Sequence, residues 1–397
     1  MDVNEPLALL GGLSPAKFMR RHWQRKPLLV RQAIPGFKPV LSRTELFAMA
    51  SRDDVESRLI VHNKTGWRMK QGPFPARGLP PLRQPAWTLL VQGADLHNQK
   101  AHELLQKFRF VPDARLDDLM ISYATVGGGV GPHFDSYDVF LLQASGRRRW
   151  KISRQTDLTL QPDVPLKILQ NFAPEDEYLL EAGDMLYLPP RYAHDGLAET
   201  SGLGEGQTSD CMTYSIGFTA PAKGELAAEL LHRLAEFRED DHASGTDGPS
   251  TSRYRDSGQP ATASPAALPE ALTTFARQAV LDVLTDPLAL ACALGEYMTA
   301  LKPSVWFDET TAGLDLSGED VSVQLDTRTR MMYDANHIFI NGESHRARGR
   351  DARLMHLLAD ARSLPAPALR KASRAALELL ADWRDAGWLT AMKGHER

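Results

Sequence analysis

The sequence contains little cysteine and no long apolar run. Among its 397 residues there are two cysteines, Cys211 and Cys292, which are too few for a disulfide framework or a zinc ribbon and which suit a reducing compartment. No segment reaches the roughly 18 consecutive apolar residues needed to cross a bilayer, and the N-terminus has no signal-peptide pattern. We therefore expect a soluble, cytoplasmic protein without membrane contact.

Neither sign of charge dominates. The chain has 46 Lys and Arg against 50 Asp and Glu, a formal net charge of −4. This balance excludes a strongly basic nucleic-acid coat and a strongly acidic tail protein as descriptions of the whole chain. At a prior of about 150 residues per domain, the length predicts two or three domains.

The spacing of strands and turns predicts an α+β protein. Short strands separated by glycine-containing turns favour an antiparallel barrel or sandwich. The polar segment near 238–268 has almost no apolar anchors, so we predict a flexible insert there. Near the C-terminus we expect Val321–Leu325 and His337–Ile340 to form a strand pair. The expected strands of the barrel lie at 119–125, 138–143, 147–152 and 185–188, and the expected helices after it at 224–237 and 269–301.

His133 and Asp135 are candidates for metal ligation. Alternate side chains of a strand share a face, so an imidazole and a carboxylate here would supply two ligands of the 2-His-1-carboxylate triad that holds non-haem Fe(II). The best candidate for the third ligand is His194, which follows a turn, a strand and a two-proline corner. The alternative is that His-X-Asp occurs by chance and that these histidines are structural.

Arg148 is a candidate for binding an anion inside the barrel. It lies in Gly146-Arg-Arg-Arg-Trp, where Arg148 and Trp150 would share one strand face. A buried arginine needs a negative partner, and the far carboxylate of a metal-chelating dicarboxylate would provide one. The alternative for the arginine run is a solvated edge strand. The hydroxyl of Ser122 could support the same carboxylate or could bond to backbone instead.

The glycines of Gly127-Gly-Gly-Val-Gly131 do not form a phosphate-binding loop. They lack the G-x-G-x-x-G spacing, and no Gly-Lys-Ser/Thr follows them. We expect them to let the backbone turn tightly before His133.

Together these motifs resemble the bacterial ribosomal oxygenases, which are JmjC-type cupins that use Fe(II) and 2-oxoglutarate. The resemblance covers about residues 14–220. It is carried by Trp23-Gln-Arg-Lys-Pro-Leu-Leu-Val, by Gly131-Pro-His-Phe-Asp-Ser-Tyr-Asp-Val-Phe, by Gly146-Arg-Arg-Arg-Trp and by Gly183-Asp-Met-Leu-Tyr-Leu-Pro-Pro.

The resemblance implies the following organisation. Residues 1–220 would form a double-stranded β-helix (cupin/JmjC) catalytic domain with an N-terminal helical and strand extension. Residues 221–303 would form a helical dimerisation region that contains the insert, and residues 304–397 a small winged-helix-like domain. The protein would then be a homodimer, although the insert leaves the geometry of the dimer open.

The resemblance also implies a reaction. His133, Asp135 and His194 would bind Fe(II), Arg148 would pair with the C5 carboxylate of the cosubstrate 2-oxoglutarate, and Ser122 would touch that cosubstrate. O2 would be the oxidant, with no catalytic side chain beyond the metal centre. The implied substrate is an arginine side chain of a large-subunit ribosomal protein. Residues close to the ligands in sequence that could line its pocket are Tyr137, Asp138 and Asp195.

Three other functions stay open at this point. The same chemistry could act on a ribosomal histidine or on another protein, or the barrel could be a metal-binding cupin without oxygenase activity. The C-terminal part could instead be a winged-helix regulator, because residues 344–397 contain eleven Lys and Arg against six Asp and Glu, a net of +5. We favour a solvated helix face for these charges and expect no DNA binding, although a basic face could help docking to ribosomal components.

Overall fold

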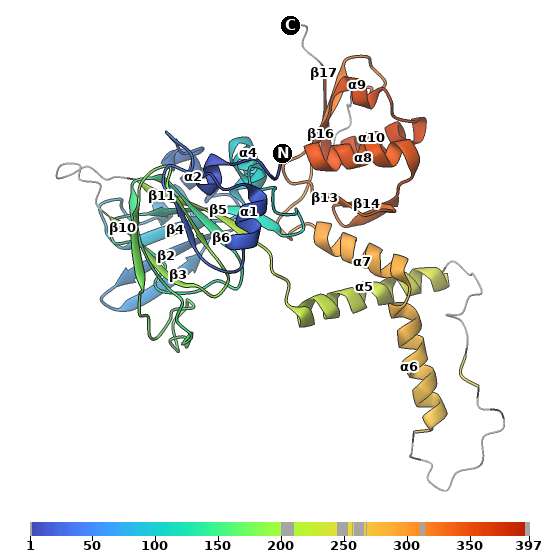
Figure 1. The fold of residues 1–397 in the computed structure, drawn as a ribbon, viewed down its shortest axis with the longest axis horizontal. Coiled ribbons are helices and arrows are strands. Elements are labelled where there is room, and N and C mark those ends of the chain that lie inside the picture. The colour runs from blue at the N-terminus through green and yellow to red at the C-terminus, as the bar shows by residue number, and fades with distance from the viewer. Residues whose placement is uncertain are drawn as a thin grey trace. The chain divides into compact units, whose positions relative to one another are not determined.

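The computed structural model describes residues 2–199, 210–243, 253–255, 257, 266, 268–309 and 314–393. Two compact units form, one from residues 1–220 with 303–306 and the other from 221–302 with 307–397 (Figure 1). The predicted insert near 238–268 lies for the most part outside the described residues.

Short helices form one layer of the N-terminal unit. Ser14 and Ser42 accept hydrogen bonds from the backbone of the first turns of α1 and α2, and Asn98 does the same for α4. Such caps satisfy N–H groups that have no partner within the helix. The helices are α1 (Pro15–Arg21), α2 (Arg43–Met49), α3 (Ala94–His97) and α4 (Gln99–Gln106).

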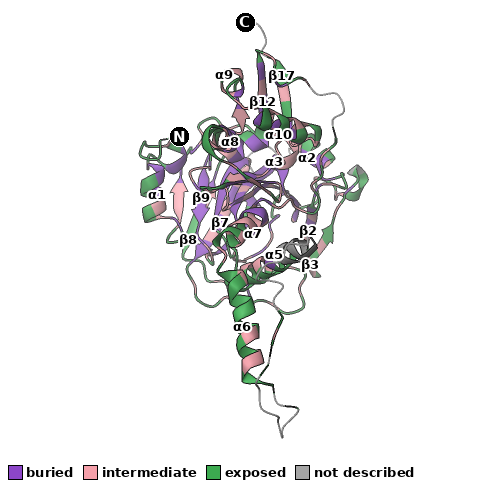
Figure 2. Cartoon of the chain, turned by 90° about the vertical axis from the view of Figure 1, so that its right-hand side faces the viewer, coloured by how far each residue is buried: buried purple, intermediate pink, exposed green. Residues whose placement is uncertain are grey.

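An eight-stranded antiparallel sheet forms the second layer. Its order is β1-β9-β6-β11-β5-β4-β2-β3. One face packs on the helices through a core that includes Phe18, Phe108 and Phe140, and Figure 2 shows its strands as largely buried. The strands are β1 (Leu28–Val30), β2 (Ser57–Asn63), β3 (Gly66–Gln71), β4 (Trp87–Val91), β5 (Leu116–Ala124), β6 (Val139–Ser145), β9 (Met185–Leu188) and β11 (Cys211–Phe218).

A smaller sheet, with the order β10-β7-β8, covers the other face. Its strands are β7 (Arg147–Ser153), β8 (Asp176–Leu180) and β10 (Ala193–Glu199). Trp150 and Ile152 of β7 pack on Leu141 and Leu186 of the large sheet. Two antiparallel sheets face to face form the double-stranded β-helix that the family resemblance implies, and the space between them holds the site described below.

The C-terminal unit begins with α5 (Lys223–Ala243), α6 (Glu270–Leu284) and α7 (Pro287–Thr299). No residue of α6 is buried. Within the described part of the chain, no single helix is long and apolar enough to cross a membrane. Helices α6 and α7 are long and apolar enough only when they are taken together, and the chain bends by 62° between them.

The remainder of this unit combines two three-stranded sheets with helices. The predicted pairing of residues 321–325 with 337–340 is wrong: β12 pairs with β16 and β17, whereas β14 pairs with β13 and β15. Asn341 and Gly342 form the turn that joins β14 to β15. The elements are β12 (Val321–Leu325), β13 (Met331–Tyr333), β14 (His337–Ile340), β15 (Glu343–Arg346), α8 (Gly349–Ala361), β16 (Ser363–Leu364), α9 (Ala366–Leu369), α10 (Arg374–Asp385) and β17 (Leu389–Lys393).

Candidate metal and cosubstrate site

His133, Asp135 and His194 come together in the N-terminal unit. Their potential ligand atoms all lie within 4.8 Å of one another, and they form the one such group of three or more among the described residues. His194 Nε2 lies 3.6 Å from Asp135 Oδ2, and the two imidazole centroids are 4.2 Å apart.

The backbone brings the two histidines together in a way that the sequence analysis did not foresee. His133 and Asp135 do not lie in a regular strand: His133 forms an isolated antiparallel bridge to His194 of β10. The bridge has N–O distances of 2.9 and 2.8 Å, and the backbone N–H of Arg191 donates to the carbonyl of Asp135 at 2.7 Å. The segment before β6 thus runs along β10 and places both of its ligands beside the third.

Glycine is required where this segment approaches β10. A Cβ on Gly129 would lie 2.6 Å from the carbonyl oxygen of Gly196. Gly131 has a φ of +79°, and a Cβ there would meet Ile168 and Trp67 within 2.8 Å. The glycines therefore serve close approach and turning, as the sequence predicts, rather than phosphate binding.

The protonation of both imidazoles suits metal ligation. His133 Nδ1 lies 2.8 Å from the Gly131 carbonyl and His194 Nδ1 lies 2.9 Å from the Tyr192 carbonyl. A carbonyl can only accept, so each Nδ1 donates a proton to it, and Nε2 is the ring nitrogen that is left to face a metal. Burial and the neighbouring His133 lower the pKa of His194 to about 4, which keeps its ring neutral. Two imidazole nitrogens and a carboxylate are the donor set of a non-haem Fe(II) site.

A cavity of about 450 Å³ opens from these three side chains between the two sheets. Besides them it is lined by residues of both sheets and of the loop that carries Lys167. The polar side chains that line it are Arg58, Gln92, Asp117, Asp118, Ser122, Ser136, Tyr137, Arg148, Lys167, Thr213 and Ser215.

Arg148 is a buried cation whose hydrogen bonds are incomplete. Its residue is 4% exposed, and Nη2 donates to Ser122 Oγ at 3.2 Å. Nε is buried without an acceptor, and Arg148 forms no salt bridge within the described part of the chain. A buried guanidinium in this state is costly unless an anion binds it, so the cavity fits a carboxylate at this end.

The neighbours of Arg148 on β7 follow the predicted alternation. Trp150 shares its buried face, and the ring lies 5.7 Å from the Arg148 guanidinium. Arg149 points to the other face, where it pairs with Glu177 and Glu199. β7 is the central strand of its sheet, so the edge-strand alternative is wrong; a solvated face explains Arg149 and does not explain the buried Arg148.

Of the three residues suggested for a substrate pocket, only Tyr137 lines the cavity. Asp138 is fully buried elsewhere, where its carboxylate accepts from Tyr187 Oη at 2.6 Å and Gln24 Nε2 at 3.1 Å. Asp195 does not line the cavity, and burial raises the pKa of its carboxyl.

Sequence reasoning missed Asp117 and Asp118, which lie at the start of β5 and line the cavity. A signal for Asp118 was available. Side chains on one strand face recur at every second residue, so the face of Ser122 also carries Met120 and Asp118.

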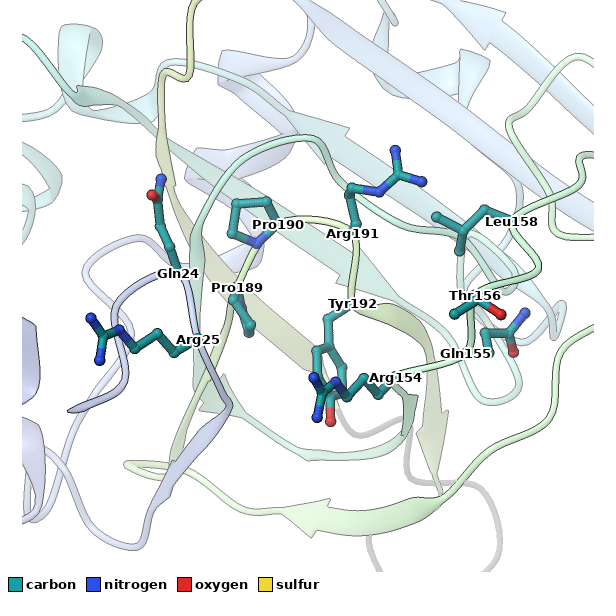
Figure 3. Close-up of a pocket in the computed structure, with 10 residues that line it drawn as sticks. All are labelled: Gln24, Arg25, Arg154, Gln155, Thr156, Leu158, Pro189, Pro190, Arg191 and Tyr192. Carbon is teal, nitrogen blue, oxygen red and sulfur yellow. The ribbon is translucent and has the colours of Figure 1, made fainter. Parts of the chain in front are cut away.

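A second cavity, of about 290 Å³, lies at the corner after β9 (Figure 3). No histidine or carboxylate lines it. In Figure 3 the guanidinium group of Arg25 lies apart from that of Arg154, and Arg191 points away from both. The cavity therefore offers neither a metal site nor a convergent anion site.

Comparison with known proteins gives matches in both units. Residues 103–226 match the model of the JmjC domain, and residues 282–390 match that of the ROXA-like winged helix. The protein named ribosomal protein uL16 3-hydroxylase of Escherichia coli (strain K12) is 33% identical over 284 residues, which cover 71% of this chain and 70% of that protein. A probable ribosomal oxygenase of Haemophilus influenzae is 33% identical over 219 residues, covering 54% of this chain and 52% of that protein.

Solved structures match over nearly the whole chain. An X-ray structure of E. coli ycfD has a TM-score of 0.80 at 27% identity and covers 95% of this chain and 98% of that one. A structure of YcfD, a ribosomal oxygenase from E. coli, in complex with cobalt and 2-oxoglutarate has a TM-score of 0.79 at 26% identity, with coverages of 96% and 98%.

Proposed function

Because this chain belongs to the ribosomal oxygenase family of JmjC enzymes, we propose that His133, Asp135 and His194 bind the Fe(II) of a 2-oxoglutarate-dependent hydroxylase. The observation that carries the proposal is the cluster itself, whose ligand atoms lie within 4.8 Å of one another and whose residues line a cavity. Bound Fe(II) and 2-oxoglutarate supply the oxidation: one oxygen atom of O2 enters a substrate C–H bond, and the other enters succinate as CO2 is lost.

The chain's own residues bind 2-oxoglutarate and orient it in the cavity. Arg148, with a buried Nε that has no acceptor, pairs with the C5 carboxylate of 2-oxoglutarate through parallel charge-assisted hydrogen bonds. Ser122 fixes the guanidinium through its 3.2 Å hydrogen bond to Nη2 and lines the same cavity. The apolar walls, including Leu141 and Trp150, exclude water from the reacting atoms. No side chain has to transfer a proton.

The proposed substrate is an arginine side chain of the large-subunit ribosomal protein uL16. The relative named ribosomal protein uL16 3-hydroxylase supports the protein, and the lining of the cavity supports the residue type. Asp117 and Asp118 line the same cavity as the metal cluster, as does Tyr137. Carboxylates complement a guanidinium in charge and in geometry, whereas a neutral imidazole has no need of two negative charges.

The experiment that tests the substrate uses short uL16 peptides with purified protein, Fe(II), ascorbate and 2-oxoglutarate. We expect mass spectrometry to find one added oxygen on one arginine, and no addition when that arginine is replaced by lysine. Oxygen found instead on a histidine, or only on peptides of other ribosomal proteins, would contradict the proposed substrate and leave the iron chemistry standing.

We also propose that the chain forms a homodimer through its helical region, residues 221–303. Helix α6 has no buried residue, although it carries several large apolar side chains. Val280, Leu281 and Leu284 are 55%, 44% and 38% exposed. Apolar side chains exposed on this scale favour association. Sedimentation should give a dimer for the wild type and a monomer for Leu281→Glu/Leu284→Glu. A wild-type monomer at micromolar concentration would overturn the proposal.

A further inference from the structure

The C-terminal unit carries seven cations on two short segments. One segment runs from the end of β15 into the start of α8, and the other joins α9 to α10. All seven residues are exposed. We call them the arginine face: Arg346, Arg348, Arg350, Arg353, Arg370, Lys371 and Arg374.

The fold brings the two segments side by side. Ser373 Oγ donates to Asp351 Oδ2 at 2.6 Å, and the backbone N–H of Ser373 lies 3.2 Å from Asp351 Oδ1. These two bonds join the first turn of α8 to the N-cap of α10. The segment that carries the cations near Asp351 thus contacts the segment that carries the cations near Ser373.

Few carboxylates neutralise this face. Asp351 is the single acidic residue between positions 346 and 359; it is bonded to Ser373 and lies 3.9 Å from Arg350 Nε. Arg374 pairs with Glu378 at 2.8 Å. Within the described residues, Arg346, Arg348, Arg353 and Lys371 form no salt bridge. A protein with a net charge of −4 therefore concentrates unpaired positive charge at one place.

The cations also occupy helix positions that disfavour them. Arg348 is the N-cap of α8, without a capping hydrogen bond from its side chain, and Arg350 lies in the first turn. Arg374 is the first residue of α10. The N-terminus of a helix carries positive partial charge, so these arginines reduce the stability of both helices. The stability of the fold therefore does not explain arginines at these positions, whereas the binding of an external anion does.

We propose that the arginine face binds the phosphodiester backbone of RNA. Arginine forms two parallel hydrogen bonds with a phosphate, and several exposed cations along a surface favour a repeating polyanion over a single small anion. That the RNA is ribosomal rests on the proposed function; the binding itself does not. The contact would hold the enzyme on a ribosomal particle while the target side chain enters the cavity of the N-terminal unit.

Fluorescence anisotropy of the full-length protein with a labelled single-stranded RNA, measured across a range of salt concentrations, tests the proposal. The variant is Arg348→Gln/Arg350→Gln/Arg353→Gln. The matched control, Arg20→Gln/Arg21→Gln/Arg25→Gln, removes the same charge from exposed arginines in and after α1. If three phosphate contacts are lost, the slope of log K against log salt falls by about 2. We expect this fall, with at least tenfold weaker binding at low salt, for the variant and not for the control.

Two further measurements keep the result interpretable. Thermal melting should give a Tm for the variant equal to or above that of the wild type, because the helix N-termini lose unfavourable charges; a lower Tm would contradict the helix argument. Hydroxylation of a short peptide in the absence of RNA should be unchanged in the variant. If the wild type fails to hydroxylate any peptide, the proposed function fails while the RNA result is still read independently.

Competition identifies the anion. DNA of the same sequence and polyglutamate are added to the preformed RNA complex. RNA bound at least as tightly as DNA, with weak competition by polyglutamate, supports the proposal. Tighter binding of DNA, more effective competition by polyglutamate, or equal loss of binding in the control variant would each overturn it.

Discussion

His133 and His194 exchange backbone hydrogen bonds of 2.9 and 2.8 Å across a single antiparallel bridge. This one bridge joins two segments that are distant in sequence, and it turns both imidazoles toward Asp135. The positions of the proposed ligands therefore depend on backbone geometry before any metal binds.

Removing one ligand should abolish metal binding and activity. We expect His133→Ala, Asp135→Ala and His194→Ala each to lower hydroxylation by more than about a hundredfold, because loss of an outer partner of a ligand already costs about 10–100-fold. Calorimetric titration with Co(II) measures the binding directly. His356→Ala, which removes an imidazole stacked on Tyr333 in the C-terminal unit, should bind the metal normally, and equal loss in this control would contradict the assignment.

Arg148→Ala should act on the cosubstrate. Each hydrogen bond to a charged group contributes about 1.5–3 kcal/mol, so losing two should raise the KM for 2-oxoglutarate by roughly a hundredfold or more, with Co(II) affinity unchanged. Ser122→Ala should give a smaller increase. Arg149→Ala is the matched control, because it lies on the same strand and pairs outward with Glu177 and Glu199. A variant of Arg148 with an unchanged KM would show that the carboxylate binds elsewhere.

Gly129→Ala should weaken both the fold and the metal site. The new Cβ would meet the carbonyl oxygen of Gly196 at 2.6 Å, so the segment must move away from β10. Overpacking of this kind costs about 1–3 kcal/mol, which a denaturant titration measures, and Co(II) affinity should fall as His133 moves. Gly224→Ala, where no atom lies within 4 Å of the new Cβ, should leave metal binding intact. If the two variants have the same stability and the same Co(II) affinity, Gly129 is not required for the close approach to β10.

Acid should destabilise the fold by protonating Asp184, whose carboxylate binds Arg31 and Gln32 directly after β1. Burial alone would raise the pKa of this carboxyl, but the backbone N–H of Gln32 and the guanidinium of Arg31 lower it overall. A depressed pKa stabilises the fold above the unfolded value of about 3.9, and this contribution disappears as the pH falls through the lower folded value. Melting curves of Asp184→Asn should therefore show a smaller loss of stability between neutral pH and pH of about 3 than those of the wild type. Identical pH profiles would contradict this.

Local patterns in the sequence predict much of this fold. The strand at residues 185–188 is found at the predicted residues as β9, because four apolar side chains between a glycine turn and two prolines have little choice of conformation. Burial alternates along β7 as predicted, so Arg148 is inside and Arg149 is outside.

Non-local pairing was beyond sequence reasoning. The strands at 321–325 and 337–340 were recognised but assigned to each other, since neighbouring strands in sequence often pair. Their partners are set by residues as far away as β17, and no local pattern encodes that choice. For the same reason His133 was predicted to lie in a regular strand. In the structure its position is fixed by a single bridge to His194 of β10. Asp117 was missed because its position relative to the metal cluster is a property of the sheet, whereas Asp118 could have been found from its spacing of four residues from Ser122 on β5.

The most direct test of the central claim is hydroxylation under isotopically labelled O2. For the wild type we predict one labelled oxygen atom in the ribosomal peptide and one in succinate, with the two products formed in equal amounts. For Asp135→Ala we predict no labelled oxygen in either compound. Oxygen derived from water in the peptide, or product formed without succinate, would contradict the assignment of Fe(II) and 2-oxoglutarate to this site.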